Sequence, residues 1–332
     1  MDKIVLEVRD LHTHFYTNNR CNKVLNGVSF EVKKGKTLCI VGESGCGKSV
    51  TVSSVMQLLP ALARIESGEI LFYDDDQEIH MENLPRNGKE INKIRGGKIS
   101  MVFQDPMTAL NPVYRVGDQI AENLRLHSEL SKKEAKQKAV QLLQDMGIPN
   151  AEQRAKEYPH QYSGGMRQRA VIAMAMACEP KLLIADEPTT ALDVTIQAQI
   201  FALMDKLKNE HDTAVIMITH DMGVVAEMAD DVIVMYMGYI VERGTAEEIF
   251  NHPTHPYTAA LLKSIPIAGK GHEQKLHPIR GTTADPYNRP AGCQFAPRCD
   301  YCTSVCENVV PSEETINGTH CVSCHHWRRE ED

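Results

Sequence analysis

The sequence predicts an α/β domain with a parallel β-sheet. Three short apolar runs, Thr37–Val41, Lys181–Ala185 and Ala214–Ile218, have the composition of buried strands, and helical stretches precede or follow each of them. Strands that are apolar throughout and alternate with helices are typical of parallel sheets covered on both faces. The first run ends in a glycine-rich turn and is followed by a predicted helix over 50–59.

Further elements are indicated by local patterns. Residues 4–8 and 28–32 read as short strands between turn-like polar residues. Residues 131–146 form an amphipathic helical pattern, in which Ser131 and Glu134 have the spacing of a capping box and Gly147 stands where a C-terminal cap is expected.

The composition favours a cytosolic globular protein. The chain has 332 residues, enough for two compact units, and its net charge of -8 argues against a nucleic-acid partner. Its longest apolar run, Ala170–Cys178, falls well short of the ~18 residues that a membrane span needs. The N-terminus lacks the pattern of a signal peptide. Any work at a membrane would therefore need other subunits to supply the membrane part.

Residues 42–49, GESGCGKS, match the phosphate-loop pattern G-x-x-x-x-G-K-[ST] between a strand and a helix. Glycines let the backbone curl so that its N–H groups face phosphate oxygens, and the helix N-terminus adds its positive dipole end. We expect Lys48 to reach the β- and γ-phosphates of ATP and the Ser49 hydroxyl to ligate Mg²⁺.

A second apolar strand, LLIADE at 182–187, ends in two acids. Asp186 is placed to hold Mg²⁺, and Glu187 can act as the general base on the attacking water. Paired acids after a strand can also be the start of a helix, so the interpretation depends on the phosphate loop earlier in the chain.

Together with further motifs, this set resembles the ABC ATPases. SGGMRQ at 163–168 resembles their signature loop, and Gln104 in VFQDP, ALD at 191–193 and His220 in ITHD match in order. The resemblance implies a RecA-like core, an antiparallel β subdomain and a helical subdomain at about 105–178. It also implies ATP and Mg²⁺ as cofactors.

In this family each ATP lies between the phosphate loop of one subunit and the signature loop of another. The resemblance therefore places Ser163, Gly164 and Gly165 on a partner's ATP. His220 resembles the switch histidine at the γ-phosphate, Gln104 a residue that links Mg²⁺ and water to the membrane subunits, and Asp193 a residue of the dimer interface. Met166 replaces the glutamine of many signature loops, which we do not interpret as inactivating. The ATP and phosphate contacts fall on Gly42, Ser44, Gly45, Cys46, Gly47, Lys48, Ser49 and Val50, with Phe15, or its rival Tyr16, against adenine.

Within the ABC ATPases, the sequence resembles one branch more closely than the family as a whole. Residues 102–112, 158–169, 185–200 and 252–266 resemble the oligopeptide/dipeptide permease ATPases, and the D-type subunit in particular. This implies a homologous F-type ATPase partner, two transmembrane permease subunits and an extracytoplasmic solute-binding protein, with the chain peripheral on the cytoplasmic face of the cell membrane. The branch also includes importers of nickel and other small solutes, and a soluble non-transport ABC ATPase is a further alternative.

Composition shifts near residue 265, which predicts an ATPase domain over 1–265, a linker over 266–290 and a cysteine-rich module over 291–328. Six cysteines in this module read as a metal site in a reducing cytosol. The resemblance implies a [4Fe–4S] cluster on Cys293, Cys299, Cys306 and Cys324. The two C-x2-C pairs keep Zn²⁺ open, on Cys299, Cys302, Cys321 and Cys324. Because the module follows a linker, we expect it to contribute nothing to the phosphate loop.

Overall fold

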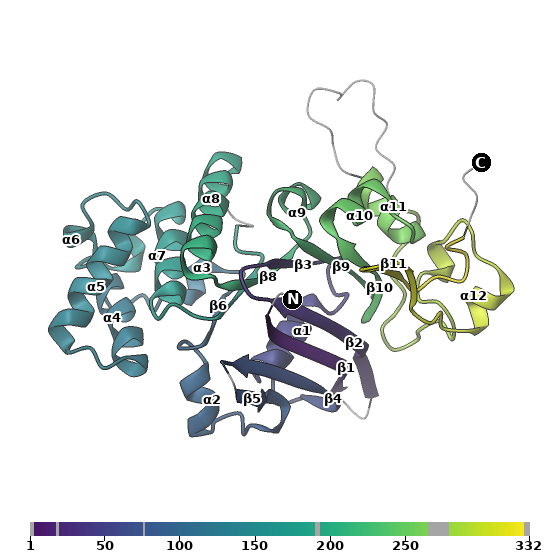
Figure 1. The fold of residues 1–332 in the computed structure, drawn as a ribbon, viewed down its shortest axis with the longest axis horizontal. Helices are drawn as coiled ribbons and strands as arrows, with labels where there is room; N and C mark the ends of the chain where they lie inside the picture. The colour runs from purple at the N-terminus through teal and green to yellow at the C-terminus, as the bar shows by residue number, and fades with distance from the viewer. Residues whose placement is uncertain (1–2, 18–19, 76, 190–192, 265–278, 329–332) are drawn as a thin grey trace. The chain divides into compact units, whose positions relative to one another are not determined.

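In a computed structural model, residues 3–17, 20–75, 77–189, 193–264 and 279–328 are described (Figure 1). The chain divides into two compact units, and neither is a continuous segment because the chain passes between them several times. The first unit comprises Met1–Leu6, Val32–Lys36 and Phe72–Ile218, and the second comprises Glu7–Glu31, Thr37–Leu71 and Thr219–Asp332.

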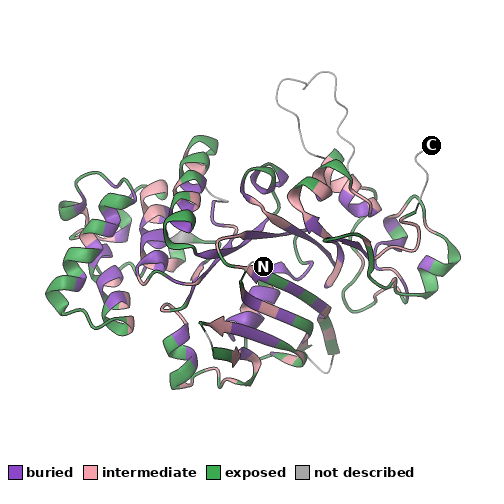
Figure 2. Cartoon of the chain, in the orientation of Figure 1, coloured by how far each residue is buried: buried purple, intermediate pink, exposed green. Residues whose placement is uncertain are grey.

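Parallel strands run through the first unit. They are β6 (Ile99–Val102), β7 (Leu182–Asp186) and β8 (Ala214–Thr219), with β7 paired to both of the others. Every residue of β7 and β8 is buried (Figure 2), as expected for strands covered on both faces. The parallel strands predicted at 181–185 and 214–218 are therefore confirmed.

Helices make up much of the rest of this unit. Helix α5 begins after Ser131 with the predicted capping box to Glu134, and Gly147, at φ 67°, ends it. Helices α3, α4 and α5 pack against α7 within residues 105–178, the range predicted for the helical subdomain. The elements are β5 (Gln77–His80), η1 (Met81–Asn83), α2 (Lys89–Ile94), α3 (Pro106–Ala109), α4 (Val116–His127), α5 (Lys132–Asp145), α6 (Ala151–Arg154), η2 (Pro159–Gln161), α7 (Gly164–Met176) and α8 (Val194–His211).

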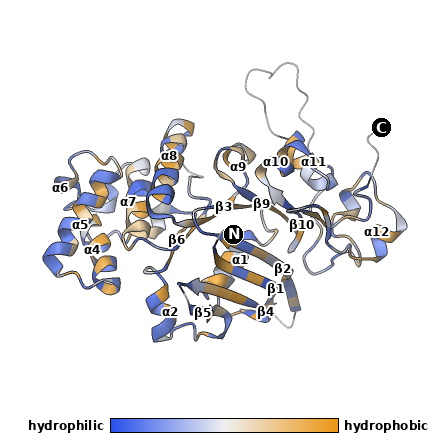
Figure 3. Ribbon diagram, in the orientation of Figure 1, coloured by the Kyte–Doolittle hydropathy of each residue, from blue (hydrophilic) through white to orange (hydrophobic). Residues whose placement is uncertain are grey.

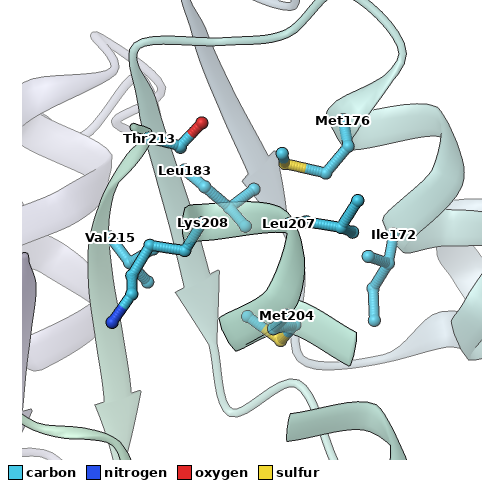
Figure 4. A pocket seen from close by; sticks show the side chains of 8 residues that line it. All are labelled: Ile172, Met176, Leu183, Met204, Leu207, Lys208, Thr213 and Val215. Atoms are coloured by element: carbon cyan, nitrogen blue, oxygen red, sulfur yellow. The ribbon is translucent and has the colours of Figure 1, made fainter. Parts of the chain in front are cut away.

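A crevice between α7, α8, β7 and β8 is part of the core rather than a ligand site (Figure 4). Apolar side chains of all four elements line it, and it has no room for a water molecule. Lys208 lays its aliphatic stem along this wall while its ammonium pairs with Asp205 at 2.9 Å.

The second unit holds the strand that leads into the glycine-rich turn. That strand is β3 (Thr37–Val41), with the predicted bounds, and α1 (Lys48–Val55) follows the turn. β3 pairs in parallel with β9 (Asp231–Tyr236), and β10 (Tyr239–Thr245), β12 (His320–Val322) and β11 (Glu314–Asn317) continue the sheet antiparallel. The remaining helices are α9 (Met222–Met228), α10 (Ala246–Asn251), α11 (Pro256–Lys263), η3 (Ala296–Arg298) and α12 (Ser304–Asn308). The cysteine-rich segment thus adds two strands to this sheet.

The N-terminal strands are longer than predicted. β1 (Ile4–Thr17), β2 (Arg20–Lys33) and β4 (Ala63–Asp74) belong with β5 to a four-stranded antiparallel sheet in the order β2-β1-β4-β5. Apolar and polar residues alternate along parts of β1 and β2 (Figure 3). Within the described ranges, no helix combines the length and apolar character required to cross a bilayer.

Candidate active site

The glycine-rich turn between β3 and α1 has the backbone of a phosphate loop. Gly42, Gly45 and Gly47 all have positive φ, at 151°, 81° and 112°. A Cβ at Gly42 would lie 2.2 Å from the carbonyl oxygen of Met235, so a side chain there would displace the loop from the neighbouring strand. The glycines are therefore required both by conformation and by close backbone approach.

Lys48 lies inside this loop. Its Nζ donates hydrogen bonds to the carbonyl oxygens of Gly42 at 2.7 Å and of Glu43 at 3.1 Å, and the side chain is almost fully buried. The next residue, Ser49, is exposed in the first turn of α1. The loop therefore presents an ammonium, a hydroxyl and a helix N-terminus together, which suits a polyphosphate and its cation.

The carboxyl ends of β6 and β7 bring two predicted residues together. Val102 pairs with Ala185, so positions two residues further along each strand lie at the same edge. There Gln104 Nε2 donates a hydrogen bond of 2.9 Å to Glu187 Oε2. Asp186, the last residue of β7, is 7% exposed. The acids and the glutamine that the sequence singled out thus form one polar cluster at the strand ends.

Glu187 has a strained backbone. Its φ is 45°, in the left-handed region that residues other than glycine seldom adopt, and its N–H donates to the carbonyl oxygen of Ile218 at 3.0 Å. Such strain is found disproportionately at functional sites, where surrounding structure holds it in place. The bend fixes where the carboxylate emerges from the sheet.

The SGGMRQ segment forms the start of α7. Ser163 is the exposed N-cap, and its Oγ accepts a hydrogen bond from the Met166 N–H at 3.3 Å. A Cβ at Gly165 would lie 3.0 Å from Ile196 Cγ2, so a larger residue would press on the first turn of α8. A hydroxyl and backbone N–H groups at an exposed helix start can receive an anion.

Asp193 and His220 both lie at the ends of elements. Asp193 is exposed and caps α8 by accepting the Ile196 N–H at 3.0 Å. Ala191 and Leu192 of the ALD motif lie outside the described residues. His220 is exposed on the turn between β8 and α9. Neither arrangement by itself assigns the role that the resemblance implies.

Phe15 and Tyr16 point to opposite sides of β1. Tyr16 already contacts two residues on its side of the strand. Its hydroxyl donates to Glu66 at 2.8 Å, and the Arg64 guanidinium lies over its ring. This hydrogen bond, with burial, raises the pKa of Tyr16 to about 12. Phe15 shares a face with Thr13, whose hydroxyl lies 3.0 Å from Ser54 Oγ of α1. Of the two rings, Phe15 is therefore on the side of the helix that follows the phosphate loop.

Five of the six C-terminal cysteines lie near one another: Cys293, Cys299, Cys302, Cys306 and Cys324. Burial, together with the neighbouring thiols of Cys306, Cys324 and Cys299, raises the pKa of Cys293 to about 11. The Cys293 N–H donates to the carbonyl oxygen of Cys306 at 2.8 Å. The five cysteines include the four residues of the predicted iron–sulfur set and also Cys302.

The two cysteines outside the predicted iron–sulfur set differ from each other. Cys302 lies beside Cys306, whereas Cys321 is buried in β12 with its sulfur 3.6 Å from Thr315 Oγ1. Among the described residues, no group of three or more His, Cys, Asp or Glu side chains is arranged to hold a metal ion.

The expectation that this segment contributes nothing to the phosphate loop is wrong. Arg298, next to Cys299, forms a forked ion pair with Glu43 of the loop, at 2.7 and 3.0 Å. Burial opposes ionisation of Glu43, but the guanidinium outweighs it and lowers the pKa of the carboxyl. No local pattern in the sequence marks this contact, and the linker predicted over 266–290 suggested separation.

Comparisons with known proteins identify the family of the chain. A family described as "ABC transporter" matches residues 25–190, and one described as "Oligopeptide/dipeptide transporter, C-terminal region" matches 241–306. The dipeptide transport ATP-binding protein DppD of Bacillus subtilis is 51% identical over 96% of this chain and 94% of its own length. The oligopeptide transport ATP-binding protein AppD of the same organism is 48% identical over 98% of both chains.

Solved structures show the same fold. A dimeric ATP-binding cassette in a post-hydrolysis state with ADP and Pi is 27% identical, with a TM-score of 0.63 over 73% of this chain and 98% of that chain. CbiO1 of Clostridium perfringens, part of an ABC transporter complex, is 28% identical with the same TM-score, over 75% and 92%. The resemblance drawn from the motifs is confirmed: this chain belongs to the ABC transporter family and carries its ATP-binding cassette.

Proposed function

We propose that the chain is the ATP-hydrolysing subunit of an importer for dipeptides or oligopeptides, peripheral on the cytoplasmic face of the cell membrane. The observation that carries the proposal is the extent of similarity. It covers both the cassette and the C-terminal region, and relatives named for dipeptide and oligopeptide transport match almost end to end.

Each site residue has its own role in ATP hydrolysis. Lys48 and the loop N–H groups bind the β- and γ-phosphates, while Ser49, Asp186 and Gln104 would hold Mg²⁺, which supplies positive charge to the phosphates when bound. Glu187 takes the proton of the attacking water, oriented by its hydrogen bond with Gln104. His220 contacts the γ-phosphate, and Phe15 stacks on the adenine.

We propose that the ATP site is completed by a second subunit. The Ser163 hydroxyl and the N–H groups at the start of α7 would receive the γ-phosphate bound by a homologous F-type ATPase, with Asp193 at the interface. ATP binding then closes the pair, and hydrolysis reopens it. Two permease subunits and a solute-binding protein complete the importer.

For the cysteine-rich segment we propose a [4Fe–4S] cluster held by Cys293, Cys299, Cys306 and Cys324. The proximity of the four side chains supports it, because four thiolates are the usual cage of that cluster. The alternative is Zn²⁺ on the two C-x2-C pairs, and the described residues, which include no group arranged to hold a metal ion, favour neither metal. When bound, the cluster would brace a segment with few large apolar residues.

The cluster is tested by purification without oxygen. Brown protein with about four irons per chain is expected, and Ser substitutions at Cys293 or Cys306 should remove the iron whereas those at Cys302 or Cys321 should not. Colourless protein with one zinc would overturn the assignment and move the ligands to the two C-x2-C pairs.

The transport assignment is tested by isolating the full chain from detergent-solubilised membranes. We expect it to copurify with two permeases and a second ATPase, and to hydrolyse ATP faster when peptide and the solute-binding protein are added. Stimulation by nickel instead of peptide would indicate that the imported solute is nickel and not a peptide. Recovery only from the soluble fraction, without membrane subunits, would contradict the importer.

A further inference from the structure

Glu43, inside the proposed phosphate loop, is held from several sides by groups far away in the sequence. Its backbone N–H donates to the Tyr257 hydroxyl at 2.8 Å, and its carboxylate accepts Arg298 in a two-pronged ion pair and Thr283 Oγ1 at 3.1 Å. The loop residue next to Gly42 is therefore fixed by α11 and by the C-terminal segment.

Arg298 is itself locked in place. Its side chain is 6% exposed, its Nε donates to the carbonyl oxygen of Arg280 at 2.8 Å, and its Nη1 donates to the Tyr236 hydroxyl at 3.2 Å. The guanidinium also lies over the rings of Tyr236 and Phe295. Planar arginine forks of this kind give directional as well as electrostatic restraint.

Arg298 lies within the cysteine-rich segment, and its backbone is held there. Its backbone N–H donates to the carbonyl oxygen of Phe295 at 2.9 Å, and Cys299 follows directly. Phe295 packs edge-on against Tyr236, with ring centroids 5.3 Å apart, and lies 5.4 Å from Tyr257. Order in this segment therefore determines where the guanidinium sits.

Glu43 connects the ion pair with Arg298 to the position of Lys48. The side chain of Glu43 is bound by Arg298, while its carbonyl oxygen accepts Lys48 Nζ at 3.1 Å. A shift of Glu43 would therefore move a hydrogen-bond acceptor of the residue expected to contact the phosphates.

We propose that Arg298 is a positioning residue for ATP binding, through which the cysteine-rich segment holds the phosphate loop in its binding conformation. Loss of order in that segment then weakens ATP binding, because apparent affinity falls with the fraction of loop in the competent shape. The inference rests on the proposed role of residues 42–49 in binding phosphate.

The test measures the dissociation constant of a non-hydrolysable ATP analogue, adenylyl imidodiphosphate with Mg²⁺, by calorimetry on the full chain. Arg298→Ala should raise it on the order of 10-fold, within the usual range of coupling between sites. Arg298→Lys, which keeps the charge but not the fork, should raise it less. The matched control is Arg328→Ala, which removes an exposed arginine of the same segment and should leave the constant unchanged.

A double-mutant cycle separates positioning from general destabilisation. Glu43→Gln should weaken binding about as much as Arg298→Ala, and the double variant should be little worse than either, since both remove one interaction. Hydrogen exchange in the nucleotide-free chain should be faster at residues 42–49 in Arg298→Ala. Coupling is reciprocal, so the nucleotide should slow exchange in residues 293–308 of the wild type.

A folded Arg298→Ala chain with unchanged affinity would overturn the inference, even if its melting temperature falls. If that variant does not fold, unchanged affinity in both Arg298→Lys and Glu43→Gln would overturn it equally. Lys48→Ala distinguishes failure of this inference from failure of the proposed phosphate loop. If Lys48→Ala weakens binding while the Arg298 variants do not, only this inference fails, whereas unchanged affinity in Lys48→Ala would refute the phosphate loop itself.

Discussion

Replacing Glu187 with glutamine isolates the base of the proposed hydrolysis. The carboxylate accepts Gln104 Nε2 at 2.9 Å, and a glutamine carbonyl oxygen can accept the same hydrogen bond, so the local geometry should survive. What is lost is the negative charge and the capacity to take a proton. A positioned general base contributes about 10²- to 10⁴-fold to a rate, or about 2.7 to 5.5 kcal/mol of the barrier.

Gln104→Ala provides the graded comparison. It leaves the base in place but removes its hydrogen bond, worth about 1 kcal/mol, together with one proposed Mg²⁺ ligand, so turnover should fall at least several-fold. Phosphate release is measured with Mg²⁺ and saturating ATP in the complex whose partner ATPase carries the equivalent inactivating change. Binding of a non-hydrolysable analogue should be retained in Glu187→Gln. Turnover of Glu187→Gln within a few-fold of wild type would refute the assignment of the base.

Further predictions concern the phosphate loop, the composite site and the helical subdomain. Lys48→Ala should raise the ATP dissociation constant by on the order of 10- to 100-fold, because a hydrogen-bonded charge is lost, and calorimetry measures it directly. Ser163→Arg should leave ATP bound to this chain's own loop but block the partner's site. A cysteine cross-link trapped with ATP should therefore join this signature loop to the partner's phosphate loop, and a link formed only within one chain would exclude the composite site. Ser131→Ala should destabilise the chain by about 1 kcal/mol in urea unfolding by removing the cap of α5. Hydrogen bonds from Ser131 lower the pKa of Glu134, so the capping box stabilises the fold above the ordinary carboxyl pKa. That difference should shrink as pH falls through the lowered pKa, and a pH-independent difference would count against the box.

The buried strands could be predicted because their sequence carries the physical signal. β3 and β7 are apolar at every position but their ends, and parallel strands covered on both faces require this. The capping box of α5 could also be predicted, because it depends on two residues only three positions apart. β1 and β2 were underestimated because Asp10 and Gly27, both at positive φ, interrupt the alternation that marks a strand.

The individual site residues could be predicted, but their contacts could not. The motifs identified Gln104 and Glu187 separately, and only the register of β6 with β7 shows that they meet. The link between Arg298 and Glu43 joins positions 255 residues apart, across a segment that reads as a linker. No periodicity or spacing reports such a long-range ion pair, because it depends on how the aromatic side chains around Tyr236 pack.

Uptake of a labelled dipeptide by cells that lack this chain tests the central claim most directly. We expect uptake to be lost, to return with the wild-type chain and to remain absent with Glu187→Gln expressed at the same level. Normal dipeptide and oligopeptide uptake in the deleted cells, or full rescue by Glu187→Gln, would contradict a role for ATP hydrolysis by this chain in peptide import.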